Sequence, residues 1–278
     1  MKWNIVTDSS CDILPADKKN GEIQISSVPF TISIGNQDFV DDEHLDTQVM
    51  LEAMEQAGCA GRTACPSPHA WLEQFEKAQN CIALTISSQL SGSMNSAMAA
   101  REMALEQNPQ KKIAVIDSKS TGPEIVLCVE EIEKLIRRGV DFEDVVFRAA
   151  NFLKKTKILF ALSSFDNLIK SGRIGKLTGF IARTFHMWGI GSGSDHGEIV
   201  VEDKTRGSKK MVEMLISKMK ENGFSGDKAA ISHCDNLPLA ETLKKRILEV
   251  WKNTEIEILP TRGLCSYYAE RGGLIVSY

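Results

Sequence analysis

One local pattern occurs three times in the first half of the chain: a short apolar run that ends in acidic or hydroxyl residues and then turns. The three copies lie at residues 3–10, 81–93 and 113–120. After the second and third copies, the apolar spacing changes to that of a helix. Strand, turn and helix in this order are typical of parallel βαβ units. We therefore predict an α/β fold that begins with a parallel sheet, with a ligand site beyond the carboxyl ends of its strands.

The length of 278 residues favours two domains. A basic, polar segment at residues 154–157 follows a predicted amphipathic helix over residues 142–153 and marks the boundary. We predict an N-terminal parallel-sheet α/β/α domain over residues 1–155 and a C-terminal mixed α/β domain over residues 156–278. Strands of the second domain are predicted at residues 158–162, 198–201, 229–233, 256–258 and 274–276, with helices between them, including one that opens at residues 173–177.

The segment between the first two copies of the pattern has a different character. Residues 28–34 and 38–40 flank a short turn and predict a β-hairpin attached to the parallel sheet. Residues 45–57 have helical spacing, and residues 58–68 predict a loop. Ser67 followed by Pro68 is a typical helix start.

Charge and composition limit the classes of partner. The net charge of −4 lacks the basic excess that nucleic-acid binding or adhesion to anionic membranes needs. No apolar segment approaches the roughly 20 residues that span a bilayer, and the first residues have no signal-peptide pattern. Seven cysteines, an odd number, fit reduced thiols better than a disulfide framework. We expect a cytoplasmic protein that neither binds nucleic acid nor spans a membrane.

The second copy of the pattern combines hydroxyls with the N–H groups of a helix start, which favours a bound carboxylate or phosphate. Ser91 is the strongest candidate, because the neighbouring Gly92 lets the backbone approach a bound group closely. Ser87, Ser93 and Ser96 are better explained as caps of the loop and the helix start.

An enzyme is the alternative interpretation. Asp8 and Asp117 are predicted at the ends of neighbouring strands, where they suggest a Mg²⁺-dependent phosphotransferase. The serine loop suggests a hydrolase, although no G-x-S-x-G elbow or phosphate-binding motif occurs. The histidines have no metal-ligand spacing, so no metal site is predicted. Arg173 follows a predicted helix end, where it either pairs with the last carbonyls or reaches the cleft to bind an acidic headgroup.

Several motifs occur together in a characteristic order. Ile231–His233 and the glycines at 272 and 273 follow further motifs at residues 197–199 and 204–210. Together with the earlier segments, they resemble the DegV family of bacterial fatty-acid-binding proteins over nearly the whole chain. The earlier segments are residues 5–12 (IVTDSSCD), 63–68 (TACPSP), 86–93 (ISSQLSGS), 117–120 (DSKS) and 168–174 (LIKSGRI).

The resemblance implies a DegV-like protein with a long-chain fatty acid in an apolar tunnel between two domains. It implies no cofactor, no metal and no catalytic residue. Such proteins are binding subunits of fatty acid kinase and present the acyl carboxylate to a separate ATP-binding subunit, which makes acyl phosphate. By motif position, Thr63, Ser91 and Gly92 bind the carboxylate, and Arg173 lies near the headgroup and the transferred phosphate. A phosphotransferase or hydrolase using Asp8, Asp117 and the Ser91 loop stays the alternative.

The sequence departs from the family pattern near its C-terminus. The family carries a histidine before its last glycines, and Tyr268 occupies that position here. A tyrosine donates a hydrogen bond but lacks the charge that an imidazolium supplies. Fatty-acid binding is therefore the expectation, and phosphoryl transfer is left open. Ala64 and Cys65 stand where the family usually has polar residues, which alters the pocket mouth.

Overall fold

The computed structural model describes residues 2–14, 21–57, 61–174 and 187–278. The repeated pattern forms a four-stranded sheet whose neighbouring strands all run parallel. In spatial order the strands are β2 (Ile23–Val28), β1 (Trp3–Asp8), β6 (Asn80–Thr85) and β7 (Lys112–Asp117). The parallel sheet predicted for the N-terminal part is confirmed. However, β6 lies between β1 and β7, so the prediction that Asp8 and Asp117 end neighbouring strands is wrong.

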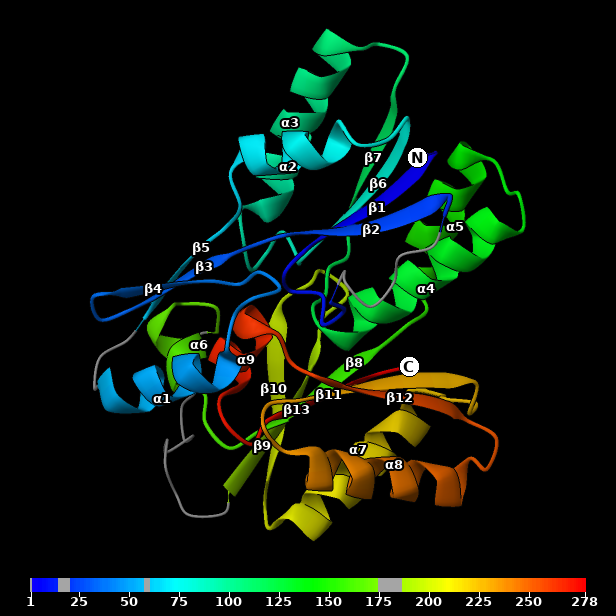
Figure 1. Ribbon diagram of the computed structural model, residues 1–278. Coiled ribbons are helices and arrows are strands. Elements are labelled where there is room, and N and C mark those ends of the chain that lie inside the picture. The colour runs from blue at the N-terminus through cyan, green and yellow to red at the C-terminus, as the bar shows by residue number, and fades with distance from the viewer. Residues whose placement is uncertain (1, 15–20, 58–60, 175–186) are drawn as a thin grey trace.

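Helices cover both faces of this sheet, as Figure 1 shows. One face carries α2 (Pro68–Phe75) and α3 (Ser93–Gln107), and the other carries α4 (Pro123–Arg137) and α5 (Phe142–Leu153). Successive side chains of a strand point to opposite faces, so each face of the sheet has its own core. Val6 packs in the core beneath α2 and α3, and Ile5 packs in the core beneath α4 and α5. The start of α2 follows the prediction: the Ser67 hydroxyl accepts a hydrogen bond from the Ala70 N–H at 3.3 Å.

A six-stranded mixed sheet forms the C-terminal part. In spatial order it contains β10 (Ile199–Arg206), β9 (Met187–Gly193), β8 (Ile158–Leu162), β13 (Leu274–Ser277), β11 (Lys228–His233) and β12 (Glu255–Pro260). Neighbours run antiparallel except for the pair β11 and β12. Helices α7 (Ser208–Glu221) and α8 (Leu237–Val250) cover one face. The α4 helix also contacts β11 and β13, which explains why its apolar residues are buried nearly all round.

The hairpin does not attach to the parallel sheet, which corrects that prediction. Strand β3 (Thr31–Ile34) pairs antiparallel with β4 (Gln37–Val40) on one edge and with β5 (Arg62–Ala64) on the other. These strands form a separate three-stranded sheet, because both edges of β3 are occupied. The predicted loop at residues 58–68 therefore contains a strand. Helix α1 (Thr47–Ala57) packs on this sheet.

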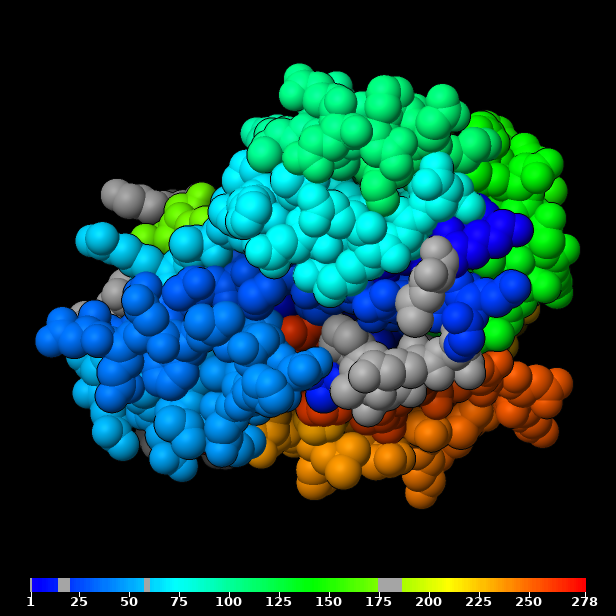
Figure 2. All heavy atoms as spheres, turned by 45° about the horizontal axis from the view of Figure 1, so that its top comes forward, coloured from blue at the N-terminus to red at the C-terminus, as the bar shows by residue number. Residues whose placement is uncertain are grey.

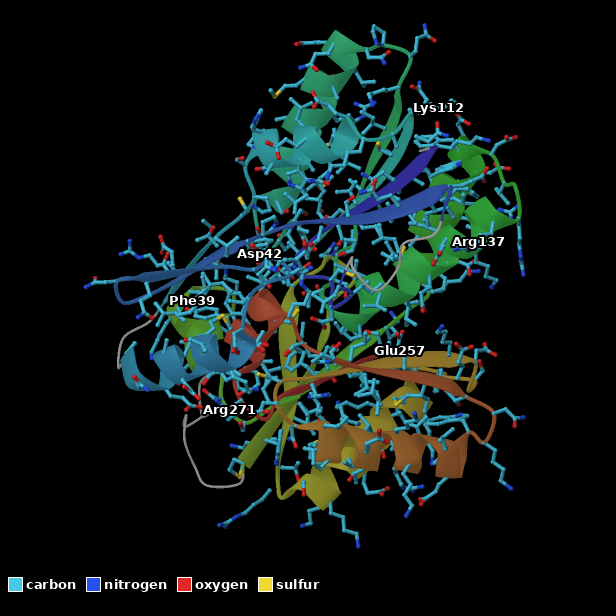
Figure 3. All side chains as sticks on the ribbon, viewed as in Figure 1. Phe39, Asp42, Lys112, Arg137, Glu257 and Arg271 are labelled. Atoms are coloured by element: carbon cyan, nitrogen blue, oxygen red, sulfur yellow. The ribbon has the colours of Figure 1, made fainter. Side chains whose placement is uncertain are left out.

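Two short helices lie near this small sheet, namely α6 (Asp166–Lys170) and α9 (Gly263–Ala269). The α9 helix contacts both α1 and β3, and red atoms of the C-terminal segment are visible between the blue and cyan N-terminal elements in Figure 2. Arg271, labelled beside α1 in Figure 3, donates to Glu55 at 2.8 Å and to Gln48 at 2.9 Å. The chain's last segment is thus tied to its N-terminal part.

The predicted helix at residues 173–177 runs past Ile174 into residues outside the described part of the chain. Among the described residues, no helix is long and apolar enough to cross a membrane.

Candidate functional site

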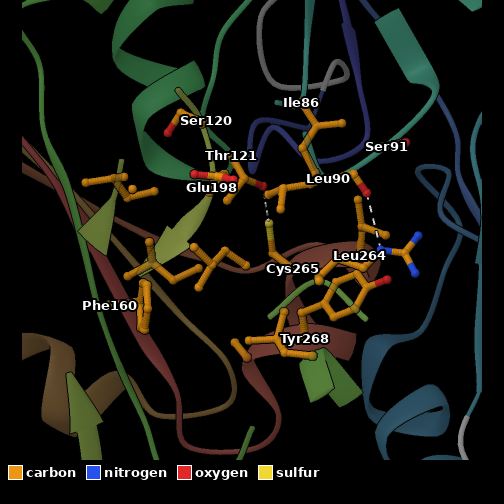
Figure 4. Close-up of a pocket in the computed structure, with 18 of the residues that line it drawn as sticks. Ile86, Leu90, Ser91, Ser120, Thr121, Phe160, Glu198, Leu264, Cys265 and Tyr268 are labelled. Carbon is orange, nitrogen blue, oxygen red and sulfur yellow. Dashed lines mark hydrogen bonds between the residues drawn. The ribbon is translucent and has the colours of Figure 1, made fainter. Parts of the chain in front are cut away.

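A cavity lies between the carboxyl ends of the parallel strands and one face of the six-stranded sheet (Figure 4). It contains about 1080 Å³ of empty space, with the open space at its mouth included. Most of its wall is apolar, with side chains from the loops that follow the parallel strands, from the six-stranded sheet and from α6 and α9. These residues include Phe30, Ile86, Leu90, Ile158, Phe160, Leu162, Leu168, Ile199, Leu264 and Ile275.

Strand β8 forms part of the wall through simple alternation. Ile158, Phe160 and Leu162 line the cavity, whereas Leu159 and Ala161 belong to the core beneath α7 and α8. Successive side chains of a strand point to opposite faces. A continuous apolar run on β8 therefore serves the cavity and the core at once.

A cluster of polar groups lies at one end of the cavity. Thr63, Ser91, Gly92, Arg173 and Tyr268, the site residues predicted from the sequence, all belong to its lining. The Tyr268 hydroxyl lies 3.0 Å from Thr63 Oγ1. The Arg173 guanidinium is centred 6.0 Å from the Tyr268 ring and donates through Nε to the Leu90 carbonyl at 3.2 Å. We call these five residues the polar end.

Arg173 makes the helix-end contact that its position suggested, and it also lines the cavity. Its Nη1 donates to the Ser171 carbonyl at 2.9 Å, which is the helix-end contact, and its Nε fixes the residue before Ser91. Nη2 makes no hydrogen bond with any described residue. A part of the guanidinium thus stays available to an anionic group in the cavity.

The buried carboxylate of Asp8 holds the loop that contains Ser91, which runs from the end of β6 to the start of α3. Asp8 accepts hydrogen bonds from the Ile86 N–H at 2.9 Å and from the Ser93 hydroxyl at 2.6 Å. It also accepts from the Ser10 hydroxyl at 2.5 Å and from the Ser10 N–H at 3.2 Å. Burial raises the pKa of Asp8, and these hydrogen bonds oppose the rise. Asp8 is therefore a buried anchor that fixes both ends of the loop.

A second buried carboxylate sets the direction of α9. Asp41 accepts hydrogen bonds from the N–H groups of Gly263 and Leu264, each at 2.8 Å, at the start of this helix. Burial raises the pKa of Asp41, and the adjacent Arg262 guanidinium opposes the rise. These contacts place Leu264 in the cavity wall and Tyr268 at the polar end.

Ser87, Ser93 and Ser96 were predicted as caps, but the Ser93 hydroxyl donates to Asp8 and the start of α3 has no side-chain cap. The Ser87 hydroxyl donates to the Gly197 carbonyl at 2.6 Å and so joins the loop to the β9–β10 turn. Ser96 lies 4.0 Å from Cys65. None of these three belongs to the cavity lining, in contrast to Ser91.

The two aspartates of the enzyme interpretation do not converge. The Asp117 carboxylate accepts hydrogen bonds from Ser88 at 2.6 Å and from the Lys119 N–H at 2.9 Å, while Asp8 is enclosed. Neither residue lines the cavity. Within the described ranges, no group of three or more His, Cys, Asp or Glu side chains could hold a metal ion.

The far end of the cavity was missed by sequence reasoning. It is lined by Phe160 of β8, by Gly193 of β9 and by Glu198 and Ile199 at the start of β10. A Cβ atom on Gly193 would lie 2.9 Å from Ile158, so only a glycine leaves this space. The glycines of β9 were a signal, since a glycine within a strand often marks a close approach.

The sequence matches a known protein family over nearly its whole length. The sequence model described as "Uncharacterised protein, DegV family" matches residues 2–278. A DegV domain-containing protein of Streptococcus pyogenes serotype M1 is 40% identical over 278 residues, covering 100% of this chain and 99% of the relative.

Solved structures agree with this assignment. The Streptococcus pneumoniae fatty acid kinase (Fak) B3 protein loaded with linoleic acid is 41% identical, with a TM-score of 0.96, over 100% of this chain and 99% of that one. A DegV family protein of Eubacterium eligens loaded with heptadecanoic acid is 38% identical, with a TM-score of 0.94, over 99% and 98% of the two chains. The chain belongs to the DegV family.

Proposed function

We propose that this protein binds a long-chain fatty acid in the cavity, with the carboxylate at the polar end and the acyl chain along the apolar wall. The observation that carries this proposal is one cavity with a largely apolar wall and, at one end, a cluster of hydroxyls with a guanidinium. Relatives that share about 40% of the sequence were solved with linoleic acid and heptadecanoic acid.

The energetics support the same ligand class. Burial of an acyl chain contributes about 0.8 kcal/mol per CH₂ group, so a long chain binds tightly with few polar contacts. A carboxylate that leaves bulk water needs compensating hydrogen bonds. We propose that the hydroxyls of Thr63 and Ser91 and the N–H of Gly92 donate them, with Arg173 beside the headgroup.

We further propose that the protein is not itself a catalyst but presents the carboxylate to an ATP-binding kinase subunit, which forms acyl phosphate. The likeness to the Fak B3 protein supports this role. Acyl phosphate formation with a purified kinase subunit, compared between the wild type and Tyr268→His, tests what the replacement of the family histidine does to the transfer step. A fatty acid that binds but is never phosphorylated would contradict the role in the kinase.

The binding proposal is tested by mass spectrometry of protein purified from cells. We expect a released fatty acid, and we expect Thr63→Ala together with Ser91→Ala to weaken its retention. Ser88→Ala is a matched control, because the Ser88 hydroxyl is bonded to Asp117 and lies outside the cavity lining. An empty protein that takes up no fatty acid in solution would refute the proposal.

We also propose that residues 1–155 and 156–278 are two domains with the ligand between them. The parallel sheet and its helices end with α5 at Leu153, and the six-stranded sheet begins with β8 at Ile158. A cytoplasmic location is proposed because the six described cysteines are free, as expected in a reducing compartment.

A further inference from the structure

The far end of the cavity carries polar groups of its own. They come from the β9–β10 turn and from the loop after β7, and these two segments are in contact, since a Cβ atom on Gly197 would lie 3.0 Å from Cα of Lys119. The polar side chains that these segments add to the lining are those of Lys119, Ser120, Thr121 and Glu198. We call these four residues the distal polar group. In Figure 4, Glu198 and Thr121 lie on one side of Cys265, and Tyr268 of the polar end lies on the other.

Most protons of the distal polar group are engaged within the protein. The Ser120 hydroxyl donates to the buried Glu124 carboxylate, and the Thr121 hydroxyl donates to a backbone carbonyl at 3.4 Å. The Lys119 ammonium donates to the Asp195 carbonyl at 3.1 Å, outside the cavity lining. What the far end presents to a ligand is therefore chiefly oxygen atoms that can accept a hydrogen bond.

Glu198 has the strongest of these acceptors. Its backbone is fixed, because its N–H donates to the Ser194 hydroxyl at 3.0 Å and its carbonyl accepts from the Ser194 N–H at 2.8 Å. Its carboxylate makes no hydrogen bond or ion pair within the described part of the chain. The side chain is exposed at the edge of the cavity, so it is accessible both to water and to a ligand. An ionised carboxylate only accepts hydrogen bonds, so a ligand group that pairs with Glu198 must carry a proton.

The two ends of the cavity therefore suit opposite groups. The Arg173 guanidinium only donates hydrogen bonds, whereas the Glu198 carboxylate only accepts them. A fatty-acid carboxylate is attracted to the first and repelled by the second. Among groups that donate, a neutral hydroxyl costs far less than an ammonium to bring from water into a largely apolar cavity. A hydroxyl on the acyl chain is the ligand group that best fits Glu198.

We propose that the cavity takes hydroxylated fatty acids, with Glu198 accepting a hydrogen bond from a hydroxyl on the distal half of the acyl chain. This inference rests on the proposed fatty-acid binding and names a class of ligand for the same cavity. Glu198 is then a residue that determines specificity: a hydroxyl without a partner weakens binding in an apolar cavity, and Glu198 offsets a loss that a plain acyl chain never incurs.

Titration calorimetry on delipidated full-length protein tests the inference with two matched pairs of ligands. The pairs are ricinoleic acid with oleic acid, and ω-hydroxypalmitic acid with palmitic acid. Within each pair the acids differ by one hydroxyl, which lies past the middle of the chain in ricinoleic acid and at its end in ω-hydroxypalmitic acid. We expect Glu198→Ala to weaken the hydroxy acid of at least one pair about three- to tenfold, the usual effect of one hydrogen bond. The plain acid of that pair should stay within about twofold.

Two further variants separate the hydrogen bond from a general effect of charge. Glu198→Gln keeps a neutral acceptor of the same size, so its loss for the hydroxy acid should be smaller than that of Glu198→Ala. Asp195→Ala removes a negative charge from the same β9–β10 turn, at a side chain that is 92% exposed and outside the cavity lining. It should leave the affinity for all four acids within about twofold of the wild type.

The outcomes are distinct. Hydroxy acids of both pairs that bind Glu198→Ala as tightly as the wild type would overturn the inference and leave fatty-acid binding intact. Equal losses for the plain and the hydroxy acid would show that Glu198 only supports the cavity wall, and equal losses in Glu198→Ala and Asp195→Ala would show an effect of charge alone; either result overturns the inference. A wild type that binds none of the four acids overturns the proposed function, and this inference with it.

Discussion

Ser93→Ala removes one donor from the buried Asp8 carboxylate and tests whether this anchor holds the Ser91 loop. Ser93 is fully buried at the start of α3, and its hydroxyl donates to Asp8 at 2.6 Å. Hydrogen bonds to charged groups contribute about 1.5–3 kcal/mol. Alanine is smaller than serine and favours a helix slightly, so the substitution introduces no steric conflict. We expect the free energy of unfolding to fall by about 1.5–3 kcal/mol at neutral pH.

The same helix provides the control. Ser96 lies one turn further along α3, and its hydroxyl has only the 4.0 Å contact with Cys65 among the described residues. Ser96→Ala should therefore change stability by less than about 0.5 kcal/mol. Urea denaturation followed by far-UV circular dichroism measures both variants under one two-state analysis.

The pH dependence makes the test sharper. The hydroxyl of Ser93 stabilises the ionised form of Asp8, so its loss raises a pKa that burial has already raised. The destabilisation by Ser93→Ala should therefore be larger at pH 8, where Asp8 is more fully ionised, than at pH 5. Equal effects for Ser93→Ala and Ser96→Ala, or an effect that grows as the pH falls, would refute the anchor role of Asp8.

Two further predictions concern buried and crowded positions. Burial raises the pKa of Asp12 to about 6, so its ionised carboxylate lowers the stability of the fold as the pH rises from about 4 to 6. In urea unfolding at pH 7, Asp12→Asn should therefore have a free energy of unfolding up to about 3 kcal/mol higher than the wild type. A difference that shrinks with rising pH would contradict this. Gly197→Ala should lower the free energy of unfolding by about 2–4 kcal/mol, because the backbone has a φ of +91° and the added Cβ would collide with Ser87. Gly223→Ala is the control: it has a φ of +78° but open space around it, so it should cost about 1–2 kcal/mol. Equal losses for the two variants would exclude the collision.

The strands, the helices and the Ser91–Gly92 part of the polar end were predictable because their signals are local. A strand that ends in hydroxyl residues before a helix places Ser91 and Gly92 beyond the carboxyl ends of the parallel strands, and this placement does not depend on contacts with distant parts of the chain. The helix over residues 142–153 and the strand over residues 158–162 are observed with these bounds. Thr63, Arg173 and Tyr268 came from motif position, and the structure brings them to the same cavity end as Ser91.

Features that depend on partners distant in sequence were not predictable. The pattern at residues 28–40 predicts a hairpin, but it does not say which strand pairs with its free edge, and the three-residue β5 supplies that partner. Asp8 was an enzyme candidate because an isolated aspartate at a strand end carries no sign of four incoming hydrogen bonds. Those donors come from Ser10, Ile86 and Ser93, two of them more than 70 positions away.

The two ends of the cavity contribute in different ways to a bound fatty acid. Each methylene along the wall of β8 adds about 0.8 kcal/mol, whereas each hydrogen bond at the polar end adds about 0.5–1.5 kcal/mol net. In the complex that we propose, the acyl chain therefore provides most of the affinity, and the hydroxyls of Thr63 and Ser91 fix where the headgroup lies. A binding protein that presents a carboxylate to a partner needs this division, because the headgroup must be oriented without being held so tightly that it cannot react.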